Sequence, residues 1–303
     1  METDPLAAMR DSLGEDLCAL LHRGDVPVRE VQPLIARETP DRPPRAFRVL
    51  YADGQARKAV RCAQPAQAAL VVAISRRIDP AAFAPVLAHA GAALLMPWID
   101  GVPLHATGWD VHEVRHVGRM LAALHAAAVP EDAAANAVGL GRYATLLRRN
   151  LAILVRQSAI AEDQAQALLA LAQAHAPSAC SAAVIHRDLC PENLVRQPSG
   201  ALRVVDVETL SIGARDYDLA RTWYRWSMPP DQRQALFDAY VADGGRRPDW
   251  HHFPYWAICA TASSAAQRQQ LWPAGATIPL QRLGALRRHL ESGSDGQQLA
   301  LRG

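Results

Sequence analysis

The sequence predicts an α+β fold in two lobes, a small antiparallel-sheet lobe followed by a larger and mainly helical lobe. In the first part of the chain, strand-like segments flank an Asp53–Gly54 turn, which is typical of a β-hairpin. From residue 111 onward, apolar residues recur at helical spacing instead. The length of 303 residues is sufficient for two domains, which we place at residues 1–100 and 101–303.

Local patterns predict the elements of each lobe. In the first lobe we expect helices over residues 6–23 and 64–74, a strand or helix over 28–35, and strands over 46–52, 55–62, 85–89 and 93–98. In the second lobe, amphipathic spacing predicts helices over residues 111–127, 141–157, 161–175, 216–227, 231–242 and 251–270. The polar tail from about residue 291 has no such pattern and is expected to be disordered. The apolar stretch 81–99 is interrupted by prolines and a glycine, so it is expected to form strands and no transmembrane helix.

Two polar motifs carry the functional prediction. The segment HRDLCPENLV spans residues 186–195, and the run RVVDVE ends at Glu208. Phosphoryl transfer requires a group that positions the acceptor hydroxyl and oxygen ligands that hold Mg²⁺. Asp188 can accept the hydroxyl proton or orient it, while Asn193 and Asp206 supply the hard oxygen atoms that Mg²⁺ prefers. The spacing therefore predicts a Mg²⁺-dependent phosphotransferase.

His186 and Glu208 border these three residues. We expect His186 to brace the loop. Glu208 follows Asp206 by two residues and so shares its strand face, which makes it a candidate further metal ligand or a partner of one. The alternative interpretation is a polar surface turn around Pro191. The position of the motif between an apolar run and a strand disfavours that alternative.

The segment HRDLCPENLV resembles the catalytic loop shared by protein kinases and by the aminoglycoside phosphotransferase and choline kinase superfamily. Protein kinases that phosphorylate Ser or Thr usually carry Lys at the position of Cys190. The residues DVE, 206–208, are similar to the D-hydrophobic-E of the small-molecule kinases. The segment SIGARDYDLA, 211–220, is similar to the family's G…DLA segment, in which Asp218 would anchor the catalytic loop. The resemblance implies a protein-kinase-like fold and a small-molecule kinase.

Two upstream segments extend the resemblance. LLMPWIDGVPL, residues 94–104, is similar to the family's strand, interlobe hinge and entry to the second lobe. This similarity implies that the purine of ATP or GTP hydrogen-bonds the backbone near Pro97 and Ile99. VGRMLAALHAAAVP, residues 117–130, resembles a helix of the family and is expected to pack in the core.

The phosphate-binding side chain of the small lobe has two candidates. Kinase-like enzymes use a strand lysine paired to a helix glutamate. Lys58, the only lysine in the chain, and Arg61 lie on opposite faces of the predicted strand, so only one of them faces the nucleotide. The distance from Gly54 favours Arg61. No glutamate occurs between Arg61 and Trp98, so the existence of an ion pair to a helix acid is left open.

The segment 38–45 precedes the first hairpin and contains no glycine. It therefore cannot enclose phosphates through close backbone approach. Arg42 and Arg45 are candidates to replace backbone donors by binding phosphate oxygens. A solvated, proline-rich turn is an equally supported alternative.

The helices after residue 220 would shape the acceptor pocket in the resembled family. This region is rich in aromatic residues, for which core packing is favoured over ligand stacking. Only four acidic residues occur between positions 219 and 270. The acidic pocket that a polycationic aminoglycoside requires is therefore not expected.

Composition limits the remaining classes of protein. The 32 basic and 30 acidic residues give a net charge of +2, so no strong overall field favours nucleic acid or an anionic membrane as a partner. The five cysteines are scattered and have no CxxC spacing, which indicates a reducing compartment and no zinc site. The acidic start of the chain is unlike a signal peptide, so a cytoplasmic location is expected.

The sequence therefore predicts transfer of the γ-phosphate of ATP or GTP to a hydroxyl of a small-molecule acceptor, with Asp188 as the catalytic base. The alternative is a pseudokinase or scaffold of the same fold, motivated by the missing helix glutamate. A protein kinase is a third and less favoured alternative. The identity of the acceptor, the choice of nucleotide and the oligomeric state are left open.

Overall fold

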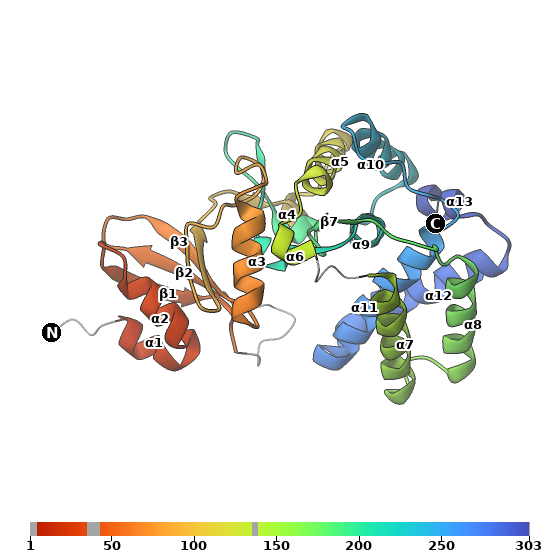
Figure 1. Ribbon diagram of the computed structural model, residues 1–303, viewed down its shortest axis with the longest axis horizontal. Helices are drawn as coiled ribbons and strands as arrows, with labels where there is room; N and C mark the ends of the chain where they lie inside the picture. Colours follow the sequence, from red (N-terminus) through yellow and green to blue (C-terminus); the bar gives the residue numbers. More distant parts are fainter. Residues whose placement is uncertain (1–4, 35–42, 135–138, 303) are drawn as a thin grey trace. The chain divides into compact units, whose positions relative to one another are not determined.

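The computed structural model describes residues 5–34, 43–134 and 139–302. The chain divides into two compact units, of which the first comprises Met1–Ala106 with Asn193–Ser211 and the second Thr107–Glu192 with Ile212–Gly303. The first unit holds a small antiparallel sheet, and the second is mostly helical (Figure 1). The predicted α+β class is therefore confirmed. Residues 193–211 group with the first unit, although residues 107–192 of the second unit precede them along the chain.

The sheet of the first unit has five antiparallel strands in the order β1-β2-β3-β5-β4. The strands are β1 Val28–Pro33, β2 Ala46–Tyr51, β3 Ala56–Arg61, β4 Ala88–Ala90 and β5 Ala93–Pro97. The turn between β2 and β3 contains Gly54 with φ +83°, a backbone conformation that side chains with a Cβ rarely adopt. The predicted hairpin is thus present in the structure.

Two helices, α1 Pro5–Leu13 and α2 Glu15–His22, pack against one face of this sheet. One helix is expected over residues 6–23, but Gly14, with φ +75°, separates two. Leu17 of α2 is fully buried in a core that includes Phe47 of β2 and Ala59 of β3. Because side chains alternate along a strand, Lys58 and Val60 point to the opposite face. The helix α3, Pro65–Ser75, contacts β4 and β5.

A second, three-stranded sheet of the first unit runs in the order β6-β8-β9, with β6 Val102–Pro103, β8 Leu194–Arg196 and β9 Leu202–Val204. Leu194 pairs with Val204, and the backbone N–H of Val205 donates to the carbonyl of Asn193 at 3.1 Å. This pairing brings Asn193 to the same end of the hairpin as the residues that follow β9. Those residues form a short 3₁₀ turn, η2, Val207–Thr209.

The second unit contains two paired strands, β7 Ala182–Ile185 and β10 Ser211–Ala214. Its larger helices are α5 Val111–Ala126, α7 Leu140–Arg156, α8 Glu162–Ala174, α9 Arg215–Arg225, α10 Pro230–Ala242, α11 Phe253–Leu271, α12 Thr277–Glu291 and α13 Gly296–Arg302; its shorter turns are α6 Glu131–Ala134, η1 Pro191–Asn193 and η3 Pro273–Ala276. The short helix α4, Leu104–Thr107, lies where the first unit ends along the chain. Helices α5 and α10 lie side by side (Figure 1). Helix α11 contacts α7, α8, α9 and α12, which explains why most of its residues are buried.

The C-terminal segment differs from the expected disordered tail. Residues 296–302 form α13, in which Leu299 and Ala300 are buried. The indole N–H of Trp223 donates to the carbonyl of Ala300 at 2.8 Å. The few apolar side chains of this short segment therefore pack in the core. The average polarity of the segment, on which the expectation of disorder was based, does not show this. No helix in the described part of the chain combines the length and apolar character needed to cross a bilayer.

Candidate active site

The first cluster of functional residues surrounds Lys58 of β3. Its Nζ contacts the Oδ1 of Asp206, the Oε1 of Glu208 at 3.1 Å and the carbonyl of Val205 at 3.1 Å. Lys58 is only 8% exposed. Burial lowers the pKa of Lys58, but the carboxylates of Glu208 and Asp206 outweigh burial and hold this pKa above its usual value. Lys58 is therefore a fixed, fully charged cation.

The structure places Lys58, and not Arg61, beside Asp206 and Glu208. The two side chains lie on opposite faces of β3, as the alternation predicts. Arg61 lies on the face that α1 and α2 cover. Its Nη1 is close to Gly14, the residue between these two helices, and lies 3.2 Å from the position that a Cβ atom of that residue would take. Lys58 takes the other face, beside Asp206. The physical reason is that the N-terminal helices occupy the Arg61 face, which the distance from Gly54 cannot reveal.

Glu208, an acidic partner of Lys58, is itself held by helix α3. Helix α3 places Gln67 near Glu208, and the Gln67 Nε2 donates to the Glu208 carbonyl at 3.0 Å. Glu208 in turn offers both of its carboxylate oxygens to Lys58, at 3.1 and 3.3 Å. The acidic partner of the lysine thus comes from η2, and α3 holds the backbone of that partner.

Asp206 and Asn193 offer a donor set that fits Mg²⁺. They lie at the same end of the β8–β9 hairpin, and the Asp206 side chain is 38% exposed. Among the described residues, no group of three or more His, Cys, Asp or Glu side chains could hold a metal ion. One carboxylate and one amide oxygen suit Mg²⁺, which protein sites commonly bind together with phosphate oxygens and water.

The other predicted nucleotide-binding residues occupy different parts of the first unit. Pro97 ends β5, and Ile99 follows in the irregular segment before β6. Arg45 lines a surface hollow together with Arg61, so the structure does not bring Arg45 to Lys58. Arg42 lies outside the described residues.

The second cluster of functional residues surrounds Asp188. Arg221 and Arg225 of α9 approach its Oδ1 at 3.2 Å (Nη2) and 3.3 Å (Nε). The Nη2 of Arg225 also lies 3.2 Å from the sulfur of Cys190 and 3.5 Å from Glu192. Burial alone raises the pKa of Asp188, but Arg221 and then Arg225 lower it below its usual value. Asp188 is therefore ionised at neutral pH.

The loop that carries Asp188 is anchored on a buried carboxylate. Asp218 is fully buried, and it accepts the backbone N–H groups of His186 at 2.8 Å and Arg187 at 2.7 Å. Arg187 has φ +70°, a strained conformation for a residue with a side chain. The His186 Nδ1 accepts the N–H of Asp188 at 3.3 Å. Asp218 and His186 thus hold the backbone on both sides of Arg187.

Sequence reasoning missed three residues of the second cluster. Arg221 and Arg225 are four positions apart, so they lie on one face of a helix, and that spacing could have revealed them. The Nε2 of His125 of α5 donates to the carboxylate of Asp218 at 3.2 Å, and the Nδ1 of His125 lies 2.9 Å from the hydroxyl of Tyr240. No local pattern links His125 to Asp218, because they are distant in the sequence.

Solved structures share the fold of this chain. A macrolide 2′-phosphotransferase, MphH, from Brachybacterium faecium aligns with a TM-score of 0.59 at 18% identity, covering 94% of this chain and 98% of the other. The choline kinase LicA from Streptococcus pneumoniae aligns with a TM-score of 0.65 at 12% identity, covering 86% and 94%. At these identities the likeness establishes the fold. A comparison with curated protein sequences found no match.

A family model extends this likeness from fold to family. Residues 16–254 match the model described as the phosphotransferase enzyme family, known as APH. The matched region covers more than half of the chain and contains Lys58, Asp188, Asp206 and Asp218. The predicted family is therefore confirmed, and the chain belongs to the phosphotransferase enzyme family.

Proposed function

We propose that this phosphotransferase transfers the γ-phosphate of ATP or GTP to a hydroxyl of a small-molecule acceptor and uses Mg²⁺ as its cofactor. The observation that carries the proposal is the contact of the only lysine with Asp206 and Glu208. A strand lysine with an acidic partner is one of the features that kinase-like turnover requires. Its presence weakens the reason for the pseudokinase alternative, which is the missing helix glutamate.

Asp188 is proposed to orient the acceptor hydroxyl and to receive its proton. Because Arg221 and Arg225 lower the pKa of Asp188, the carboxylate is a weak base and is ionised at neutral pH. A weak base suits phosphoryl transfer, in which positioning and electrostatic stabilisation dominate over early proton abstraction. The anchored loop supplies this positioning, since Asp218 and His186 fix the backbone of the base.

The remaining roles follow from charge and donor type. Asn193 and Asp206 would hold Mg²⁺, which neutralises charge on the nucleotide phosphates when bound. Lys58 donates to phosphate oxygens, and Glu208 keeps its ammonium group in place. The purine is proposed to hydrogen-bond the backbone near Pro97, which has a carbonyl acceptor but no N–H, and Ile99.

Named relatives support nucleotide use and leave the acceptor open. LicA has also been solved in complex with AMP, and a spectinomycin phosphotransferase of this fold has been solved with ADP and spectinomycin. Macrolides, choline and spectinomycin, after which these proteins are named, differ widely in size and chemistry. They therefore support a small-molecule acceptor for this chain without naming it.

The test is a phosphotransfer screen of hydroxyl-bearing antibiotics, amino alcohols and sugars, followed by comparison of Asp188→Asn with the wild type. We expect Asp188→Asn to lower the rate of nucleotide hydrolysis or transfer by roughly 10² to 10⁴. Nucleotide with Mg²⁺ should still raise the melting temperature of this variant. Asp231→Asn, an exposed position in α10, is the matched control. Equal rates for Asp188→Asn and the wild type would refute the proposal.

A further inference from the structure

A polar cavity in the second unit lies beside the start of α9. Residues 177–181, which precede β7, and the connection between α10 and α11 form much of its wall. Its volume is about 310 Å³, at the lower end of the range of roughly 300–1,000 Å³ for small-molecule sites. Its wall carries three arginines and two aspartates, namely Arg215, Asp216, Arg246, Arg247 and Asp249. Arginines therefore outnumber carboxylates around this space.

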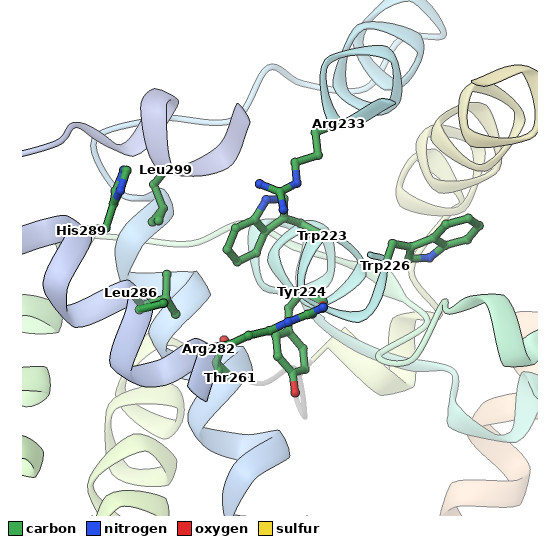
Figure 2. A pocket seen from close by; sticks show the side chains of 10 residues that line it. Trp223, Tyr224, Trp226, Arg233, Thr261, Arg282, Leu286, His289 and Leu299 are labelled. Carbon is green, nitrogen blue, oxygen red and sulfur yellow. The ribbon is translucent and has the colours of Figure 1, made fainter. Parts of the chain in front are cut away.

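A second cavity of the same unit, shown in Figure 2, differs in size and lining. It holds about 170 Å³ and is lined chiefly by aromatic and apolar side chains, among them Trp223, Tyr224 and Leu286. Its Arg282 lies 5.1 Å from the centre of the Tyr224 ring and donates to the Tyr224 carbonyl. This cavity is below the usual volume of a small-molecule site, whereas the polar cavity is large enough.

The arginines of the polar cavity have donors that the protein does not use. No carboxylate in the described part of the chain forms an ion pair with Arg215, Arg246 or Arg247. Arg246 and Arg247 are both exposed. A guanidinium group has five N–H donors in a planar fork that matches the oxygens of phosphate. Three such groups around one cavity are suited to an anion with several oxygens.

The two aspartates of the wall differ in their contacts. The Oδ1 of Asp249 accepts the backbone N–H of His251 at 3.0 Å, and its Oδ2 lies 3.8 Å from the Nε2 of His252. Asp216 is only half-buried, and within the described residues its carboxyl group forms no hydrogen bond. Burial raises the pKa of Asp216, although the charge of Arg215 opposes this rise. Asp216 is therefore the carboxyl group of the wall that remains open to a ligand's hydroxyl.

The backbone of the loop that carries Arg246 and Arg247 is packed closely on α10. The N–H of Gly245 donates to the carbonyl of Tyr240 at 2.9 Å. A Cβ atom at Gly245 would lie 2.5 Å from this carbonyl oxygen and from the Tyr240 ring, so the approach requires glycine. The loop is therefore positioned before a ligand binds, which lowers the entropy lost on binding.

We propose that this cavity binds a phosphate group, either as free phosphate or on a small hydroxylated molecule. Arg215, Arg246 and Arg247 pair with the phosphate oxygens, and Asp216 accepts a hydroxyl of the attached molecule. Phosphate suits three guanidinium groups better than a carboxylate does, because it offers them more oxygen atoms. The lining residues are separate from the clusters around Lys58 and Asp188, so the proposal goes beyond phosphotransfer and does not require it.

The test is calorimetric titration with inorganic phosphate and, separately, with glycerol 3-phosphate, without nucleotide or Mg²⁺. We expect the double variant Arg246→Gln/Arg247→Gln to weaken binding of both probes by roughly tenfold to a hundredfold. The double variant Arg148→Gln/Arg149→Gln removes the same charge from an exposed pair of α7 that does not line the cavity. This control should bind both probes as the wild type does. Melting curves check that each variant folds.

A second variant closes the cavity and leaves its arginines in place. Ala179 lines the cavity and is exposed, so Ala179→Trp fills the space without removing a charge. We expect this variant to lose binding of both probes. Equal phosphate affinity in the wild type and in every folded cavity variant would overturn the proposal, as would absence of binding to the wild type.

Asp216→Ala identifies the source of the phosphate. If glycerol 3-phosphate binds the wild type more tightly than phosphate does, and Asp216→Ala removes the difference, the occupant is a phosphorylated hydroxy compound. Equal affinities of the two probes in the wild type support free phosphate. A difference that persists in Asp216→Ala would contradict the role of Asp216.

Lys58→Met separates this site from the proposed nucleotide site. It lacks the lysine proposed to bind nucleotide phosphates but retains the cavity, so we expect it to bind both probes as the wild type does. Loss of binding in Lys58→Met, with unchanged binding in Arg246→Gln/Arg247→Gln, would place the phosphate at the nucleotide site and refute the proposal. Because binding is measured without catalysis, failure of this proposal is distinguishable from failure of the proposed phosphotransfer.

Discussion

The two functional clusters have opposite excess charge. Around Lys58, two carboxylates surround one cation. Around Asp188, two guanidinium groups face one carboxylate. The first cluster is therefore suited to a further cation, and the second is suited to a further anion. The excess charge of each cluster indicates whether a cation or an anion binds there. No single residue of the sequence motifs gives this information, because the excess charge depends on how the residues are grouped in the fold.

The largest expected effect concerns the anchor of the second cluster. Asp218→Ala removes a buried acceptor from the backbone N–H groups of His186 and Arg187, and His186 is itself fully buried. We expect the free energy of unfolding to fall by about 3 to 5 kcal/mol, as measured by urea denaturation. Asp231→Ala, at an exposed helix start, should have little effect.

The pH dependence of this loss has a definite sign. Burial raises the pKa of Asp218, but hydrogen bonds and charge from His125 and His186 lower it below its usual value. The ionised carboxylate therefore contributes stability well above the pKa of an unfolded aspartate, about 3.9. This contribution is lost as the pH falls through the lower, folded pKa. The difference between wild type and Asp218→Ala should shrink in the same acidic range, and a constant difference would contradict the assignment.

Lys58→Met tests the first cluster. We expect kcat to fall by roughly 10² to 10³, the usual loss when one preorganised donor is removed. Without the ammonium group, Asp206 and Glu208 face each other without a cation, so MgCl₂ should raise the melting temperature of this variant more than that of the wild type. Arg61→Met is the matched control, because Arg61 lies on the other face of β3. A larger loss of kcat in Arg61→Met than in Lys58→Met would indicate that Arg61 is the phosphate-binding side chain.

Glu208→Gln separates the proposed role of Glu208, which is to hold Lys58, from the predicted role as a further metal ligand. If it holds Lys58, the variant should raise the KM for nucleotide by about tenfold, since Lys58 keeps Asp206 as a partner. If it is instead a metal ligand, the required Mg²⁺ concentration should rise while the nucleotide KM at saturating Mg²⁺ stays unchanged. Steady-state kinetics over a matrix of nucleotide and Mg²⁺ concentrations distinguish the two results.

Much of the fold could be predicted because tight turns and amphipathic helices depend on residues that are close together in the sequence. The Asp53–Gly54 turn and the alternation around it are sufficient for the β2–β3 hairpin. Apolar periodicity likewise predicts α5 and α11. Apolar periodicity does not predict α13, whose few apolar side chains pack against helices that are distant in the sequence. It also does not predict that Gly14 divides the expected first helix into two.

Site residues that lie within a short motif could be predicted from the sequence, whereas those placed by contacts between distant segments could not. HRDLCPENLV and DVE locate Asp188, Asn193 and Asp206 because the chemistry fixes their spacing. The choice between Lys58 and Arg61 depends on which face of the sheet α1 and α2 cover, and this is a tertiary property. The same holds for His125, whose partners Asp218 and Tyr240 lie far away in the sequence.

The smallest expected effect is a shift in pH dependence. Arg225→Gln removes one of the two cations that hold the pKa of Asp188 below its usual value, so this pKa rises. The base is active when ionised, and the acidic limb of kcat/KM should therefore move to higher pH. Activity should fall more at low pH than at alkaline pH, where Asp188 remains ionised in both proteins. Arg288→Gln should leave the profile unchanged. An unshifted acidic limb in Arg225→Gln would mean that another group controls it, and that the positive excess around Asp188 acts on the bound anion rather than on the base.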